Sequence, residues 1–141
     1  MLLDGRIMGL DIGDKTIGVA VSDLMGLTAQ GVKTVKRVGK KKDIEELKAI
    51  IKERQVTKIV SGLPKNMNGT LGDRAEKTYT FAERLKEIYN GEIIFFDERL
   101  STVCAIQTLN TTNTRGKKRK EVIDTVAAAL ILQAYMDANP Q

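Results

Sequence analysis

The chain begins with three short stretches of β-like pattern, and this feature limits the folds that the rest of the sequence can complete. The stretches are Arg6 to Ile12, Thr16 to Ser22 and roughly Gly31 to Arg37. Gly13-Asp14-Lys15 separates the first two, and a segment containing Gly26 separates the second from the third, so the links are short and rich in turn formers. Three consecutive strands with short links predict an antiparallel meander.

Helical and extended patterns alternate after the meander. Asp43 can cap a first helix. The apolar face of that helix is predicted to consist of Ile44, Leu47, Ile50 and Ile51. Val56 to Val60 then predicts a buried strand, and a second helix follows. The inner face of the second helix is predicted to consist of Ala75, Phe81, Ala82, Leu85 and Ile88. Glu92 to Asp97 predicts a fifth strand.

Helices are expected to close the chain. Ser101 can cap a short helix through about Leu109, and Asn110 to Lys120 is a polar and basic stretch typical of a mobile link. The last helix should run from about Glu121 to Met136 and pack in the core, because its middle is apolar nearly all round. The whole order predicts a single α/β domain with a mixed five-stranded sheet flanked by helices. It leaves open which strand the fourth one joins.

Composition excludes several kinds of chemistry. The chain has no histidine and one cysteine, Cys104, so imidazole triads and the usual His/Cys zinc sites cannot be assembled. Carboxylates, lysines, hydroxyl groups and a bound metal remain. A net charge of +5 favours a polyanionic partner. Aromatic residues make up 4% of the chain, which argues against binding single strands mainly by stacking and favours recognition of backbone and shape.

The apolar runs, the first residues and the cysteine content predict a cytoplasmic protein. No apolar run approaches the roughly 20 residues that span a bilayer. The first nine residues are interrupted by Asp4 and Arg6, unlike a secretory signal. A single cysteine fits a reducing compartment.

Asp11 is a carboxylate in an otherwise apolar strand. Alternation places it on the face shared by Ile7 and Gly9, where an ionised carboxylate needs a cation or hydrogen-bond donors. A purely structural alternative is an aspartate at a strand end that accepts hydrogen bonds from the amides of Gly13 and Asp14. The segment alone leaves both interpretations open.

Two further positions carry acids where apolar residues are expected. Asp124 lies in the first turns of the most apolar helix, in register with Ala127, Ala128 and Ile131, although interaction with the helix dipole would also explain it. Asp97 and Glu98 end the fifth strand, where side chains of open α/β sheets commonly meet ligands. Alternation groups Glu98 with Ile94 and Phe96 but does not identify the face of the site, and either acid can instead cap the following turn.

Convergence of these acids would require a counter-charge. Mg²⁺ prefers oxygen ligands and is typically held by a few carboxylates plus substrate phosphate. Paired ions of this kind can activate water and stabilise the leaving oxygen of a phosphodiester. The acids therefore predict a metal-dependent nuclease.

Four motifs together resemble one family. They are the run from Asp11 to Asp23, the loop from Gly62-Leu63-Pro64 through Gly69-Thr70, the run from Asp97 to Thr102 and the run from Asp124 to Gln133. In this order, over essentially the whole chain, they closely resemble the YqgF family, also called RuvX.

The resemblance implies a ribonuclease H-like fold, a Holliday junction resolvase activity and a role in maturing the 5′ end of the 16S ribosomal RNA precursor. It implies that Asp11, Glu98 and Asp124 are catalytic and bind Mg²⁺ or Mn²⁺. The family often has arginine where this chain has Thr16, which leaves Lys15 as the phosphate contact of that turn. The strand Ile59-Val60-Ser61 lacks the acid found in related resolvases, so one or two metal ions are possible.

Basic residues near the motifs are candidates for contacts with nucleic acid. They are Lys15, Lys65, Arg74, Arg99, Arg115, Lys117, Lys118, Arg119 and Lys120. The last five are expected to precede the helix that carries Asp124. Such charge runs also occur as ordinary solvated surface.

Three functions remain as hypotheses. The first is an endonuclease acting on structured nucleic acid, either precursor ribosomal RNA, in contact with ribosomal particles, or branched DNA. The second is an ATPase or sugar kinase, which shares the Asp-x-Gly hairpin but generally needs a second related half. The third is a nucleic-acid-binding module without catalysis. Cleavage of RNA fits a monomer, and resolution of a junction favours a homodimer.

Overall fold

The computed structural model describes residues 5–64, 72–98 and 116–139, with the backbone alone for 116–124. These residues form five strands and three helices. The strands are β1 Arg6–Ile12, β2 Thr16–Ser22, β3 Ala29–Lys36, β4 Val56–Leu63 and β5 Glu92–Asp97. The helices are α1 Lys40–Glu53, α2 Asp73–Lys86 and α4 Gly116–Ala138. Within this part of the chain, no helix is both long and apolar enough to span a bilayer.

The strands form one mixed sheet in the order β3-β2-β1-β4-β5. β2 pairs with β1 and β3 in antiparallel fashion, which confirms the meander. β4 pairs in parallel with β1, on the side away from β2, and β5 pairs in parallel with β4. The carboxyl ends of β1, β4 and β5 therefore meet at one edge of the sheet.

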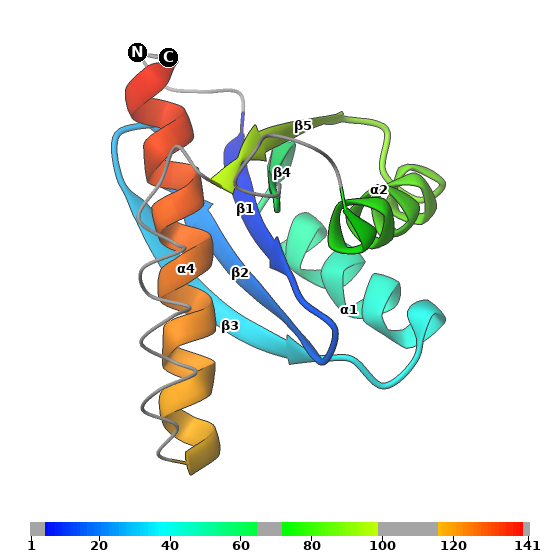
Figure 1. Cartoon of the computed structure of the whole chain (residues 1–141). Helices are drawn as coiled ribbons and strands as arrows, with labels where there is room; N and C mark the ends of the chain where they lie inside the picture. The colour runs from blue at the N-terminus through cyan, green and yellow to red at the C-terminus, as the bar shows by residue number, and fades with distance from the viewer. Residues whose placement is uncertain (1–4, 65–71, 99–115, 140–141) are drawn as a thin grey trace.

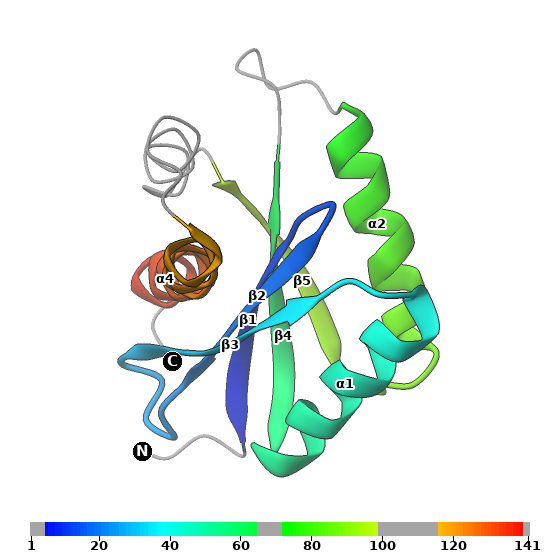
Figure 2. The same ribbon diagram turned by 90° about the horizontal axis from the view of Figure 1, so that it is seen from below.

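The helices cover the two faces of the sheet unequally. Figure 2 shows α4 on one face and both α1 and α2 on the other, and Figure 1 shows α4 running along β2 and β3. Alternation along β1 divides the core accordingly: Met8 and Leu10 pack towards α1 and α2, whereas Ile7 packs with α4. Asp11 therefore belongs to the α4 face, as its spacing from Ile7 predicts.

A glycine in β1 sets how closely α4 approaches the sheet. A Cβ atom at Gly9 would lie 2.7 Å from the Cβ of Leu132 and 2.8 Å from the carbonyl oxygen of Ala128. The helix backbone therefore rests directly on β1, two residues before Asp11. This contact fixes the middle of α4 against β1, two residues from the acid.

Several predicted element boundaries were wrong. β4 continues three residues beyond Val60, to Leu63, because its last residues are buried and pair with β5. α1 begins at Lys40, with Gly39 as its N-cap, so Asp43 is not the cap residue. Asp43 instead lies buried in the first turn and accepts a hydrogen bond from the amide of Val38 at 3.0 Å.

The other two helices also differ from expectation. α2 ends at Lys86, and Ile88 is 37% exposed, so Tyr89 rather than Ile88 fills the core there. α4 begins at Gly116, so the backbone of Lys117 to Lys120 belongs to the helix and does not precede it. The predicted helix from Ser101 to Leu109 lies outside the described residues.

Candidate active site

Asp11 and Glu98 lie at the carboxyl edge of the sheet. Asp11 is the penultimate residue of β1, and Glu98 directly follows β5. Both strands run parallel to β4, which lies between them. The topology therefore brings together two acids that are far apart in the sequence.

The packing of β5 identifies the face of the sheet to which Glu98 belongs. Ile94 and Phe96 pack with the α4 cluster, whereas Ile93 and Phe95 pack with the α1 and α2 cluster. The predicted grouping of Glu98 with Ile94 and Phe96 is confirmed, and this face is the one that carries Asp11.

Gly62 of β4 makes room for Glu98. A Cβ atom at Gly62 would lie 2.8 Å from Oε1 of Glu98 and 3.1 Å from its Cγ, and 2.6 Å from Cδ1 of Ile131 in α4. The glutamate side chain therefore lies across the intervening strand, against the surface that α4 covers. The sequence pattern placed Gly62 in a loop, which was wrong, and did not predict this role, because the parallel neighbours of β4 were unknown.

The two carboxyl groups are buried in contact with each other. Asp11 is 8% exposed and Glu98 is 3% exposed. The pKa of Glu98 is raised to about 8, chiefly by burial, and then by the charge of Asp11 and a hydrogen bond with it. The guanidinium of Arg74 opposes this shift, whereas the nearby charge of Asp97 adds to it.

This pair has the chemistry of part of a hard-cation site. Two buried carboxylates repel each other when both are ionised, and a divalent cation with a preference for oxygen ligands removes that repulsion. Among the side chains that the structure describes, no three Asp, Glu, Cys or His residues gather to hold a metal. Asp124, the third predicted ligand, lies on the backbone of α4, four residues before Ala128, and its side chain is outside the described set.

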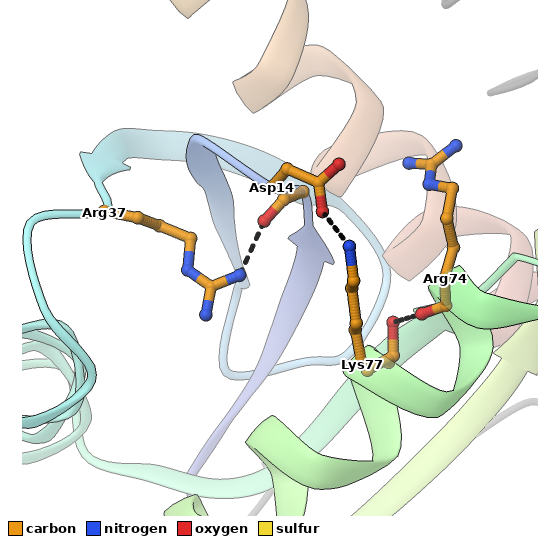
Figure 3. A network of polar contacts seen from close by, with 6 residues as sticks. Asp14, Arg37, Arg74 and Lys77 are labelled. Atoms are coloured by element: carbon orange, nitrogen blue, oxygen red, sulfur yellow. Dashed lines mark hydrogen bonds and ion pairs between the residues drawn. The ribbon is translucent and has the colours of Figure 1, made fainter.

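Two of the predicted nucleic-acid contacts can be placed. Lys15 is exposed in the turn between β1 and β2, and Arg74 is exposed in the first turn of α2, close enough to act on the charge of Glu98. Figure 3 shows Arg74 beside Lys77 on α2. The Nζ atom of Lys77 lies 3.4 Å from Oδ1 of Asp14, which is in the β1–β2 turn with Lys15. The other predicted contacts lie outside the described side chains: Lys65, Arg99, Arg115, Lys117, Lys118, Arg119 and Lys120.

A separate groove of about 680 Å³ lies over α1 and α2, on the opposite face of the sheet. Its exposed charges are balanced. Lys40, Lys77 and Arg84 face Asp14, Asp73 and Glu76. The groove has no excess of basic side chains, and neither Asp11 nor Glu98 lines it, so the acid pair remains the candidate active site.

Comparison with known proteins identifies the same family as the four sequence motifs. The family model RuvX, described as Holliday junction resolvase, matches residues 5–138. A protein of Clostridioides difficile is 69% identical over 136 residues, which cover 96% of each chain. A protein of Thermoanaerobacter pseudethanolicus is 57% identical over 135 residues, which cover 95% of this chain and 97% of that protein. Both bear the name "Putative pre-16S rRNA nuclease".

Solved structures with a similar fold include two resolvases. RuvC of T. thermophilus in complex with a Holliday junction substrate has a TM-score of 0.55 at 11% identity, and the match covers 96% of each chain. The Fowlpox virus resolvase with Holliday junction DNA has a TM-score of 0.52 at 13% identity, covering 96% of this chain and 99% of that one. The likeness confirms the ribonuclease H-like fold.

Proposed function

The chain belongs to the RuvX family and is a nuclease, and from that premise we propose that it hydrolyses phosphodiester bonds at the 5′ end of the 16S ribosomal RNA precursor. The observation that carries the proposal is the buried contact between Asp11 and Glu98 at the carboxyl edge of the sheet. The names of the curated relatives favour the ribosomal precursor as substrate.

We assign Asp11, Glu98 and Asp124 as the residues that hold Mg²⁺ or Mn²⁺. The described pair supports the assignment, because two carboxyl groups buried in contact need a counter-charge to be ionised together. A bound divalent cation supplies Lewis-acid stabilisation of the charge that develops on the phosphodiester.

The protein side chains then have distinct roles. Glu98 holds a proton on its carboxyl group, because burial beside Asp11 raises its pKa, and a bound cation would favour the ionised form. Arg74 and Lys15 bind substrate phosphates, since each presents an exposed cation near the acid pair or in the turn that follows Asp11. The basic residues whose side chains are not described are assigned to the same backbone contacts.

A cytoplasmic location and contact with ribosomal particles follow from this substrate and belong to the same proposal.

A second candidate is resolution of four-way DNA junctions. The description of the family model favours it. Symmetric cleavage of two strands would require a two-fold dimer, whereas RNA trimming requires only one copy of the site.

One experiment separates these functions. Purified protein is incubated with precursor 16S RNA and with a four-way junction, each with Mn²⁺, Mg²⁺ or EDTA. We expect metal-dependent cleavage of the precursor, its loss in Asp11→Asn, and unchanged RNA binding by that variant. Asp14→Asn is the matched control, because Asp14 is exposed in the adjoining turn. Cleavage that survives EDTA would contradict the metal assignment, and undiminished cleavage by Asp11→Asn would contradict the site.

A further inference from the structure

The turn that follows Asp11 is held from outside the hairpin as well as from within it. Inside, the amide of Gly13 donates to the carbonyl oxygen of Thr16 at 2.9 Å. Outside, Arg37 reaches the turn twice: its Nη1 donates to the carbonyl oxygen of Gly13 at 2.8 Å, and its backbone amide donates to that of Lys15 at 2.9 Å. Figure 3 shows the guanidinium of Arg37 directed at this turn.

Arg37 is itself fixed by groups from both helices on the far face of the sheet. Its Nε lies 3.5 Å from Oδ2 of Asp43 in α1, and its guanidinium carbon lies 5.2 Å from the centre of the Phe81 ring in α2. Asp43 is 2% exposed and also accepts a hydrogen bond from the amide of Val38. The guanidinium is therefore held by a buried ion pair and an aromatic face, and its own side chain is only 18% exposed.

We infer that Arg37 is a positioning residue for the nuclease site: it locks the β1–β2 turn to α1 and α2, and thereby holds the carboxylate of Asp11 and the backbone of Lys15 in place. Asp11 is two residues from the carbonyl group that Arg37 binds. Groups that hydrogen-bond to a metal ligand affect metal affinity strongly. Arg37 acts one step further away, through the backbone of Gly13, by fixing the strand end that carries the ligand. The expected effect of Arg37 on catalysis rests on the proposed function, whereas its expected effect on the β1–β2 turn is independent of that function.

The alternative is that Arg37 only stabilises the fold. A matched control, Ile50→Val, separates the two roles. It removes one buried carbon from α1, which packs on the same face of the sheet, and it leaves the turn unchanged. Arg37→Gln and Ile50→Val are compared at a temperature at which urea titrations show both variants to be folded.

Three readouts test the inference. Hydrogen exchange measures the protection of the Gly13 amide, and we expect Arg37→Gln to exchange about tenfold faster than Ile50→Val. Titration with Mn²⁺ alone measures affinity, and we expect Arg37→Gln to bind about tenfold more weakly. In cleavage assays, we expect kcat to fall more than KM changes, because the amide of residue 37 still donates to the carbonyl oxygen of Lys15 and Arg74 is untouched.

Arg37→Lys gives a second measurement should the glutamine variant not fold. It keeps the charge beside Asp43 but replaces a fork of donors with a single ammonium group, and we expect an Mn²⁺ affinity about threefold below that of the wild type. Wild-type exchange at Gly13 together with wild-type Mn²⁺ affinity in either variant would overturn the inference. A wild-type protein that cleaves neither substrate would instead refute the proposed function, and exchange at Gly13 would still decide the role of Arg37.

Discussion

The carboxyl groups of Asp11 and Glu98 are in hydrogen-bonding contact although a whole strand, β4, separates the strands that lead to them. The contact is possible because β4 has Gly62 at this point, and the glutamate side chain occupies the space that a Cβ atom would fill. The acid pair thus depends on a residue that contributes no functional group. This dependence makes the site testable without altering either acid.

Replacement of Gly62 by alanine should disable the site while leaving the fold intact. The added Cβ meets Oε1 and Cγ of Glu98 and Cδ1 of Ile131. Both side chains are buried and must shift, so some stability should be lost, and activity is compared where urea titration shows the variant to be folded. Displacing Glu98 by about 1 Å should lower kcat by about 100-fold. Cleavage and Mn²⁺ titration measure the effect. Gly39→Ala is the matched control, because a Cβ atom there meets nothing within 4 Å. Similar activity in both variants would disprove the dependence.

The stability of the metal-free protein should decrease as the pH rises. The pKa of Glu98 is raised from 4.5 to about 8 in the folded protein, so between these values the unfolded chain ionises while the folded protein keeps its proton. Stability from this group is greatest below the unfolded pKa and is lost as the pH approaches 8, by an amount on the order of 3 kcal/mol. Urea unfolding in EDTA at several pH values measures the loss.

Glu98→Gln removes this titration, together with its interaction with Asp11. The glutamine side chain cannot ionise, so the free energy of unfolding of the variant in EDTA should vary less between pH 5 and pH 8 than that of the wild type. The difference in this free energy between the two proteins should grow with pH. The affinity of the wild type for Mn²⁺ should rise with pH, opposite to its stability in EDTA, because metal binding competes with the proton on Glu98. Parallel stability curves for the two proteins would show that Glu98 has an ordinary pKa.

The fold was predicted from the sequence where local patterns determine it. The meander and the alternation of helix and strand follow from short-range periodicity, and Ile7 identified the face of Asp11. The partner of β4 was not predictable, because pairing with β1 is a long-range choice that the pattern of β4 does not encode. The same limit concealed Gly62, whose role depends on what lies on both sides of its strand.

Element ends were predicted less well for a related reason. Asp43 is a residue type that favours the N-cap position, but its carboxylate binds Arg37 and the amide of Val38. The N-cap is Gly39, four residues before Asp43, and the helix begins at Lys40. Arg37 itself showed no signal in the sequence, since its partners come from three separate elements. The acids were easier to recognise because burial of a charge is visible as a break in an apolar pattern.

Arg74 should make a measurable electrostatic contribution to RNA binding. Its charge already acts on Glu98, so a phosphate near the acid pair would lie within its range. Arg74→Ala should weaken binding and reduce the slope of log affinity against log salt concentration by about 1. Fluorescence anisotropy over a range of salt concentrations measures this slope. Arg84→Ala removes another exposed arginine from the same helix and should leave the slope nearer to that of the wild type. Equal slopes for the two variants would indicate only a general effect of charge.

Gln133 joins α4 to the β2–β3 loop and to the first residue of β3, and its loss should loosen the helix that carries Asp124. Its Oε1 accepts from the amide of Ala29 at 3.0 Å, and its Nε2 donates to the carbonyl oxygen of Leu27 at 2.9 Å. Gln133→Ala leaves the half-buried Ala29 amide without this acceptor, so unfolding should cost about 1 to 3 kcal/mol less. Asp137→Ala removes only the exposed contact of the same amide group and serves as the control. Urea titration compares the two variants, and equal stabilities would show that Gln133 does not hold the loop.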